Sequence, residues 1–231
     1  MTGTYIIASQ RSWNASLSDR LKEKTGLEFV SISEQSELVD DNLNKVRPKS
    51  IFFTHWSNRI PATVWQNYES IIFHMTDVPY GRGGSPLQNL IMRGHESTMI
   101  TALRCVEELD AGAVYLKRPL SLIGSADEIF TRADKVIEEM IVEIVEKQPI
   151  PQEQVGEPTF FTRRKPEQGN IVNAKSATEL FNMIRMLDAE GYPHAFLEAG
   201  DFKLEFKQAE HKADCIEAKV IFRKIEKGDK V

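Results

Sequence analysis

The amino-acid sequence predicts an α/β fold: a mostly parallel sheet with flanking helices, followed by a small C-terminal part of α+β, β-rich character. Two observations lead to this prediction. Through residues 1–75, short apolar runs alternate with segments of helical periodicity, an alternation typical of βαβ units. Residues 149–170 are then rich in Pro, Gly and polar side chains, and they precede one helical segment and several strand-like segments.

Four short apolar runs are the predicted strands of the N-terminal part, at residues 4–9, 28–33, 50–56 and 70–75. The first predicted helix has Leu17 and Leu21 at helical spacing and ends at Gly26. The second ends before Pro48, and Pro61 opens a short third helix. This order predicts a Rossmann-like sheet. Because ligands bind at the carboxyl ends of parallel strands, the segments after the third and fourth strands are candidate walls of a site.

The middle of the chain continues with a short helix and a strand pair. Ser85 and Pro86 are typical of a helix start. Residues 97–122 predict a strand, a turn at residues 109–112 and a returning strand.

A long amphipathic helix is predicted over residues 125–148, where Ser125 and Glu128 have the spacing of a capping box. The change in composition after this helix predicts a domain boundary. We therefore expect a larger domain at residues 1–148, and a linker with a small C-terminal domain at residues 149–231.

Charge and composition narrow the possible functions. The net charge is −5 and the isoelectric point is about 5.7, which argues against a nucleic-acid partner but allows a local basic pocket for a phosphorylated small molecule. No apolar run approaches the length of about 18 residues that spans a membrane. The N-terminus has no signal-peptide pattern, so we expect a cytoplasmic protein with no membrane partner. Cys105 and Cys215 lack a CxxC pattern; we expect both to be reduced and buried, with no metal site.

His74 and Asp110 are the residues on which we base a functional hypothesis. His74 lies where a predicted buried strand gives way to a turn, and Asp110 lies in the turn at residues 109–112. Taken alone, each position is more typical of packing or turn chemistry than of catalysis. The glycine-rich segment 81–84 lacks the spacing of a phosphate-binding loop and predicts a tight turn.

Residues 74–117 resemble the N10-formyltetrahydrofolate-dependent formyltransferase family. Several short motifs of that family agree here with the right gaps between them. The matching residues are His74, Thr76, Pro79, Arg82, Gly83, Pro86, Gly94, Thr98, Thr101, Leu109, Asp110 and Gly112. The resemblance implies that residues 1–148 are a catalytic domain and that 10-formyltetrahydrofolate is the formyl donor.

A second likeness, to sugar-nucleotide formyltransferases, lies further along the chain. The matching residues are Arg163, Arg164, Pro166, Gly169, Ile184, Arg185, Tyr192, Pro193, Ala195 and Phe196. The resemblance implies N-formylation of the primary amine of a nucleotide-linked amino sugar, of the pseudaminic-acid-pathway type. Two alternatives remain: a methionyl-tRNA formyltransferase, and a non-catalytic member that binds folate or a sugar nucleotide. A C-terminal edge strand would favour a homodimer.

The resemblance also assigns roles in formyl transfer. The family uses an Asn, a His and an Asp, of which His74 and Asp110 are present, whereas Ile72 stands in the place of the Asn. Attack of an amine on the formyl carbon creates an oxyanion and requires that the amine lose a proton. His74 would stabilise the oxyanion and Asp110 would accept the proton. Thr76, a backbone N–H or Asn58 would replace the missing donor.

The remaining expected site residues bind substrates. The donor's pterin would lie between the segment after the third strand and the turn at residues 109–112; the expected residues are Trp56, Asn58, Ile60, Leu109 and Asp110. For Trp56 and Ile60 the alternative is ordinary core packing. Arg82 would bind a substrate phosphate or only hold its turn. Arg163 and Arg164 would bind a diphosphate or remain solvated.

Overall fold

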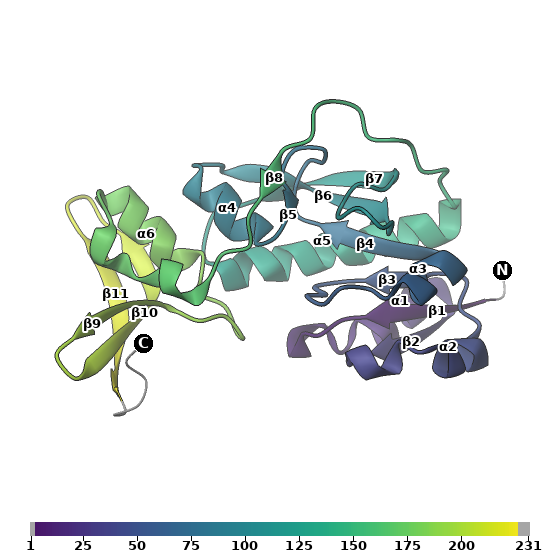
Figure 1. The fold of residues 1–231 in the computed structure, drawn as a ribbon, viewed down its shortest axis with the longest axis horizontal. Coiled ribbons are helices and arrows are strands. Elements are labelled where there is room, and N and C mark those ends of the chain that lie inside the picture. The colour runs from purple at the N-terminus through teal and green to yellow at the C-terminus, as the bar shows by residue number, and fades with distance from the viewer. Residues whose placement is uncertain (1–2, 226–231) are drawn as a thin grey trace. The chain divides into compact units, whose positions relative to one another are not determined.

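The computed structural model describes residues 3–225, which form two compact units (Figure 1). The first unit comprises Met1–Gly83, Thr98–Leu120 and Arg132–Phe160. The second comprises Gly84–Ser97, Ser121–Thr131 and Phe161–Val231. The two units interleave along the chain, whereas the sequence analysis expects one boundary after residue 148. That boundary stays a prediction.

A six-stranded sheet forms the centre of the first unit, in the order β2-β1-β3-β4-β6-β7. Its strands are β1 (Thr4–Ala8), β2 (Glu28–Ile32), β3 (Ile51–Phe53), β4 (Ser70–His74), β6 (Ser97–Arg104) and β7 (Val114–Ser121). The pairs β1–β2, β1–β3 and β3–β4 are parallel, and β4–β6 is antiparallel. The predicted Rossmann-like, mostly parallel sheet is therefore confirmed. The short strands β5 (Arg82–Gly83) and β8 (Phe160–Phe161) form a separate ladder.

Helices flank this sheet where the sequence predicts them. They are α1 (Leu17–Thr25), α2 (Asp40–Val46), α3 (Ala62–Asn67) and α5 (Ala126–Lys147), with the 3-10 turns η1 (Ser12–Asn14) and η2 (Gln35–Glu37). Gly26 ends α1 in the left-handed conformation at φ 68°, as its position predicts. The predicted capping box of α5 is present, because Ser125 N–H donates to Glu128 Oε2 (2.8 Å) and Glu128 N–H donates to Ser125 Oγ (3.3 Å).

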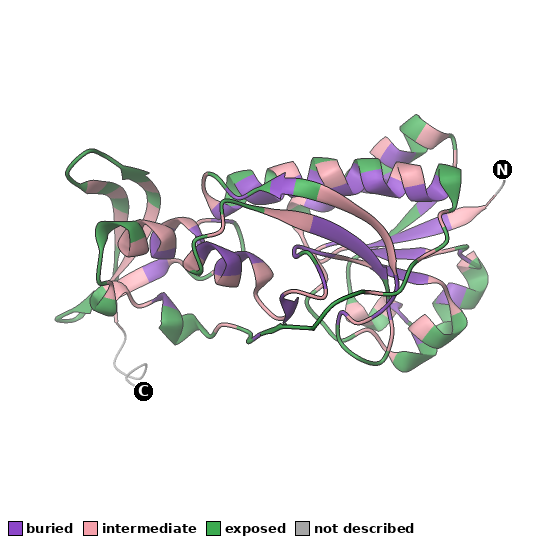
Figure 2. Cartoon of the chain, turned by 90° about the horizontal axis from the view of Figure 1, so that it is seen from above, coloured by how far each residue is buried: buried purple, intermediate pink, exposed green. Residues whose placement is uncertain are grey.

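The side of α5 that faces the sheet is buried (Figure 2). Its fully buried side chains include Ala133, Ile137, Met140 and Ile141. Glu138 joins α5 to α1, because its carboxylate accepts hydrogen bonds from Arg20 (2.7 Å) and pairs with Lys24 (2.6 Å). Burial would raise the pKa of Glu138, but the hydrogen bonds from these two cations outweigh it and lower the pKa.

The second unit is built on the predicted C-terminal elements. It contains α4 (Pro86–Met92), η3 (Pro166–Gly169), η4 (Ile171–Asn173), α6 (Ala177–Arg185), β9 (Ala195–Ala199), β10 (Phe202–His211) and β11 (Ile216–Lys224). The three strands form an antiparallel sheet in the order β11-β10-β9, and α6 packs on β10. Ser176 caps α6 by accepting a hydrogen bond from Glu179 N–H (3.1 Å). Within residues 3–225, no helix combines the length and apolar character needed to cross a membrane.

The two cysteines differ in exposure, which corrects the expectation that both are buried. Cys105 follows β6 in the first unit and is buried, whereas Cys215 lies in the exposed turn between β10 and β11. Burial, and secondarily the negative charge of Asp110, raise the pKa of Cys105 to about 11. Cys215 lies in a connection between two strands, and such connections run over the protein surface, which accounts for the exposure of this thiol.

We expect only Cys215 to react with a thiol reagent when the protein is folded. At pH 8 a group with a pKa of about 11 is almost entirely protonated, and the Cys105 thiol is also shielded from solvent. Titration with Ellman's reagent should count one thiol in the native protein and two in denaturant. Two rapidly reacting thiols in the native protein would contradict the burial of Cys105.

Candidate functional site

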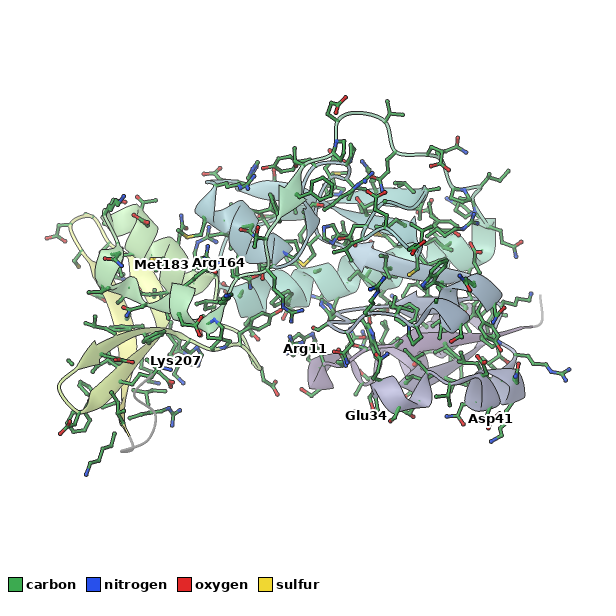
Figure 3. The ribbon with its side chains drawn as sticks, in the orientation of Figure 1. Arg11, Glu34, Asp41, Arg164, Met183 and Lys207 are labelled. Carbon is green, nitrogen blue, oxygen red and sulfur yellow. The ribbon has the colours of Figure 1, made fainter. Side chains whose placement is uncertain are left out.

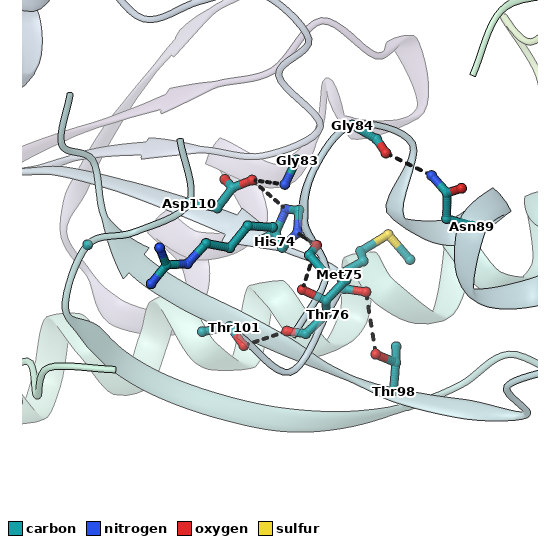
Figure 4. A network of polar contacts seen from close by, with 12 residues as sticks. His74, Met75, Thr76, Gly83, Gly84, Asn89, Thr98, Thr101 and Asp110 are labelled. Carbon is teal, nitrogen blue, oxygen red and sulfur yellow. Dashed lines mark hydrogen bonds and ion pairs between the residues drawn. The ribbon is translucent and has the colours of Figure 1, made fainter. Parts of the chain in front are cut away.

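His74 ends β4 at the carboxyl edge of the sheet and is buried (Figure 4). Its Nε2 lies 2.9 Å from the carbonyl oxygen of Gly81. Because a carbonyl oxygen only accepts hydrogen bonds, Nε2 carries a proton. Nδ1 lies 3.5 Å from Oδ2 of Asp110, within ion-pair distance. The structure therefore brings together the two residues that the sequence analysis pairs.

Asp110 is held in an unusual backbone conformation. Its φ is 55°, in the left-handed region that Asp tolerates better than most residues, and its side chain is buried. Oδ2 accepts a hydrogen bond from the backbone N–H of Gly83 (2.9 Å). Two residues further on, Gly112 passes so close to β6 that a Cβ there would lie 1.9 Å from the carbonyl oxygen of Arg104. The turn therefore needs a glycine at this point.

Both ring nitrogens of His74 face hydrogen-bond acceptors: the carbonyl of Gly81 and the carboxylate of Asp110. An imidazole beside a buried carboxylate can stabilise negative charge that develops on a substrate oxygen, and the carboxylate can accept a proton. These are the two activities that formyl transfer requires.

Thr76 supports the turn after β4. It is fully buried; its hydroxyl donates to the carbonyl of Gly81 (3.3 Å), and its own carbonyl accepts from the hydroxyl of Thr101 (2.7 Å) (Figure 4). A hydroxyl has one hydrogen to donate, and here it is used within the protein. Its expected role as a replacement donor in catalysis stays a prediction.

Ile72 continues the hydrophobic core toward the site. It pairs with Phe53 and Leu103 in the sheet and lies on the same side of β4 as His74, two residues away. The side chain packs, partly buried, against the core of the first unit. That core comprises Ile6, Ala8, Ile32, Leu38, Leu43, Ile51, Phe53 and Val64. At this position the chain thus has an apolar contact instead of the amide of the family motif.

The segment after β3 gives mixed support to the expected donor site. Trp56 and Ile60 are partly buried against the same core, as the core-packing alternative predicts, and Asn58 is exposed. Across the site, Leu109 is 64% exposed. Their expected role in donor binding stays a prediction.

A pocket of about 360 Å³ opens beside these segments. It is lined by Arg59, Ile60, Pro61, Ala62, Trp65, Gln66 and Glu107. Ile60 is the one expected donor residue in this lining; Glu107 comes from the segment just before Leu109. The pocket therefore joins the two segments between which the pterin is expected. Arg59, Gln66 and Glu107 were not predicted from the sequence, although Arg59 adjoins Ile60 and Glu107 lies two residues before Leu109.

Arg82 holds the loops of the first unit. Its buried guanidinium pairs with Glu108 (2.9 Å) and donates from Nε (3.1 Å) and Nη2 (2.9 Å) to Oε1 of Gln154. These contacts favour the alternative in which Arg82 stabilises its turn.

Arg163 and Arg164 belong to the second unit. Arg163 is exposed, whereas Arg164 is half-buried and donates to the carbonyl of Gln168 (3.2 Å) (Figure 3). The N–H of Arg164 also donates to Ser85 Oγ (3.0 Å), and burial lowers the pKa of its guanidinium. Their expected role in binding substrate stays a prediction.

A second buried His–Asp pair, missed by the sequence analysis, anchors the segment after β3. Nε2 of His55 lies 2.6 Å from Oδ1 of Asp134 on α5. The same oxygen accepts from Asn14 Nδ2 (3.0 Å), and Asn14 Oδ1 accepts from the hydroxyl of Thr54 (3.1 Å). In the sequence, the polar Thr54 and His55 directly after an apolar strand were the signal that could have indicated this pair.

Among the residues that the structure describes, no group of three or more His, Cys, Asp or Glu is arranged to hold a metal ion.

Comparison with known proteins identifies the family. A solved methionyl-tRNA formyltransferase from Clostridium thermocellum is 42% identical, with a TM-score of 0.93, and the match covers 96% of this chain and 99% of that one. The chain belongs to the formyltransferase family. A family model described as the C-terminal domain of methionyl-tRNA formyltransferase matches residues 166–223.

Two further relatives match at lower identity. A curated methionyl-tRNA formyltransferase from Sulfurihydrogenibium is 27% identical over 77% of this chain and 59% of its own length. The chain thus spans about 59% of that relative and 54–55% of the next two. HypX from Aquifex aeolicus in complex with tetrahydrofolic acid is 19% identical, over 93% of this chain and 39% of that one, with a TM-score of 0.72, which shows a shared fold.

Two expectations are corrected by these relatives. A solved protein from Mycobacterium tuberculosis, described as a likely sugar N-formyltransferase, is 15% identical over 97% of each chain with a TM-score of 0.69, and a sugar N-formyltransferase from Shewanella is 13% identical with a TM-score of 0.68. Because the 42% identical relative is a methionyl-tRNA formyltransferase, the sequence-based assignment to a nucleotide-sugar substrate is wrong. The residues that suggested it, from Pro166 onward, lie within the segment matched by the tRNA-formyltransferase model. The exclusion of a nucleic-acid partner is contradicted as well. It relied on net charge, which sums over the whole chain, whereas binding depends on local charge.

Proposed function

We propose that this protein transfers the formyl group of 10-formyltetrahydrofolate to the amino group of methionyl-tRNA. The observation that carries this proposal is the buried His74–Asp110 pair at the carboxyl edge of the sheet, in a chain that matches a methionyl-tRNA formyltransferase over nearly its full length. The non-catalytic alternative is weakened because a protein that only binds folate has no chemical need of both His74 and Asp110.

In the proposed reaction, the neutral amine attacks the formyl carbon. A new C–N bond forms, the bond between that carbon and N10 of the folate breaks, and one proton passes from the amine to N10. His74 stabilises the oxyanion of the tetrahedral centre, and Asp110 receives the amine proton, directly or through water. Because both side chains are buried, solvent screens electrostatic interactions at this site only weakly.

The donor would occupy the pocket lined by Ile60 and Glu107. Its volume of about 360 Å³ lies within the usual range for small-molecule sites. Arg59 would attract the carboxylates of the folate's glutamate.

The distribution of charge is compatible with a tRNA acceptor. Residues 161–231 contain 13 Lys and Arg against 12 Asp and Glu, so the excess of acid lies in residues 1–160. In the sheet of the second unit, Lys203 lies opposite Arg223 and Lys207 opposite Lys219, and all four side chains share one face. Glu205 neutralises part of this face by pairing with Lys203 and Arg223, which leaves Lys207 and Lys219 for phosphate contacts.

A direct assay tests the proposal. The full chain is incubated with 10-formyltetrahydrofolate and methionyl-tRNA, and formyl-methionyl-tRNA and tetrahydrofolate are measured together. We expect equal amounts of both products, a rate that falls as salt rises, and loss of turnover in His74→Ala. Free methionine and uncharged tRNA are the control acceptors. A folded protein that forms no formyl-methionyl-tRNA would overturn the proposed function.

A further inference from the structure

Residues 151–159, here called the crossing segment, follow α5 and belong to the first unit. Their composition predicts part of a linker. In the structure, Gln154 of this segment makes four hydrogen bonds through one carboxamide. Oε1 accepts from Nε and Nη2 of Arg82 (3.1 and 2.9 Å), and Nε2 donates to the backbone carbonyls of Asp110 (2.8 Å) and Gly112 (2.9 Å). Both the oxygen and the nitrogen of this carboxamide therefore have all their hydrogen-bond partners within the protein.

These contacts hold the turn that carries Asp110. The two donated bonds fix the carbonyls on either side of Ala111, next to a residue whose φ of 55° is disfavoured in a free chain. Arg82, whose guanidinium donates to the oxygen of the same amide, also pairs with Glu108, two residues before Asp110. Without Gln154, the backbone at Asp110 would lose the contacts that offset its unfavourable conformation.

Thr159, at the other end of the crossing segment, holds the backbone at Gly81, whose carbonyl contacts His74. Its hydroxyl accepts from the N–H of Gly81 (2.8 Å), its carbonyl accepts from the N–H of Arg82 (2.9 Å), and its N–H donates to the carbonyl of Pro79 (3.0 Å). The carbonyl of Gly81 is the acceptor for Nε2 of His74. One short segment thus contacts the backbone at Gly81 and at Asp110, the two partners of the imidazole.

We propose that Gln154 and Thr159 are positioning residues that set the distance and orientation between His74 and Asp110. Neither touches His74 or the carboxylate of Asp110; each acts through the backbone that carries one partner. The identity of the reaction rests on the proposed function, but the positioning itself is a property of the first unit. A displacement of about 1 Å in a reacting geometry can lower the rate on the order of 100-fold. Loss of the contacts made by this segment can therefore have a large effect on the rate.

Substitution of Gln154 distinguishes the hydrogen bonds that its oxygen accepts from Arg82 from those that its nitrogen donates to the turn of Asp110. Gln154→Glu keeps an acceptor for Arg82 but removes both donors to the turn of Asp110. Gln152→Glu is the matched control, because it makes the same chemical change two residues away, where the side chain is exposed and donates only to Ile150 O. We expect kcat to fall 10- to 100-fold in Gln154→Glu and to stay within twofold in the control. The KM values for donor and acceptor should stay within threefold of the wild type in both variants.

Gln154→Met provides a second test if Gln154→Glu does not fold. Its side chain is neutral and similar in length to that of Gln, and we expect the same fall in kcat.

Thr159 offers a rescue experiment. Thr159→Val keeps the shape of the side chain but removes the oxygen that accepts from Gly81, whereas Thr159→Ser keeps that oxygen. We expect kcat to fall about 10-fold in the Val variant and to return to within twofold of wild type in the Ser variant. Unchanged kcat in Gln154→Glu and Thr159→Val, with only a lower unfolding temperature, would show a structural role and overturn the proposal.

A second measurement separates this proposal from the proposed function. The Cε1–Hε1 NMR signal of His74, assigned by its loss in His74→Ala, reports the surroundings of the ring without any substrate. We expect it to shift in Gln154→Glu and Thr159→Val but not in Gln152→Glu. If the wild type formylates no tRNA, the proposed function fails and the NMR result alone decides the positioning role. An unshifted His74 signal in both variants would overturn it.

Discussion

Asp110→Asn should lower kcat for formyl transfer by about a thousandfold, with the folded structure retained. The amide keeps the size of the carboxylate and an oxygen that can accept from the N–H of Gly83, but it has neither the negative charge that faces Nδ1 of His74 nor the basicity to take the amine proton. Steady-state kinetics with methionyl-tRNA measures the loss, and circular dichroism melting verifies the fold.

Asp77→Asn is the matched control for this prediction. Asp77 follows the same strand as His74, but it is exposed and pairs with Lys117. Because an exposed ion pair contributes little, this variant should keep kcat within about twofold. A similar loss in both variants, or a folded Asp110→Asn protein with kcat near that of the wild type, would remove Asp110 from the mechanism.

Gly112→Ala should destabilise the protein by about 3 kcal/mol. A Cβ at this position would lie 1.9 Å from the carbonyl oxygen and 2.8 Å from the carbonyl carbon of Arg104, and backbone atoms of a paired strand cannot move aside cheaply. Since Gln154 donates to the carbonyl of Gly112, the forced shift should also reach Asp110 and lower kcat. Denaturant unfolding and kinetics on the same preparation measure both effects.

Gly26→Ala provides the comparison, because it tests backbone conformation without a clash. Gly26 has a φ of 68°, but a Cβ there would meet no atom within 4 Å. The left-handed conformation alone costs a non-glycine residue about 1 kcal/mol, and α1 ends far in sequence from the turn that carries Asp110. We expect a smaller destabilisation and unchanged kcat. An equal or larger loss of stability in Gly26→Ala would contradict the close approach of Gly112 to Arg104.

The strands and helices were predictable because their signals are local. Apolar runs of strand length, the capping box at Ser125 and Glu128, and the glycine that ends α1 each depend on residues within a few positions of one another. The pairing of His74 with Asp110 came instead from a motif resemblance, since periodicity alone does not bring two residues 36 positions apart into contact. The subfamily assignment failed because short motifs are shared across the family, and the rejection of tRNA failed because net charge does not describe a surface.

By itself, the sequence determined the order of the secondary structure, the parallel α/β class and the two candidate catalytic residues. Only the tertiary structure decided what surrounds them. It placed Ile72 on the core, directed the hydroxyl of Thr76 to Gly81, and used Arg82 to hold a turn. It also brought Gln154 to Asp110, 44 residues earlier in the chain. Such contacts are set by how the strands and loops pack together, and a buried polar group takes whichever partner that packing brings within reach.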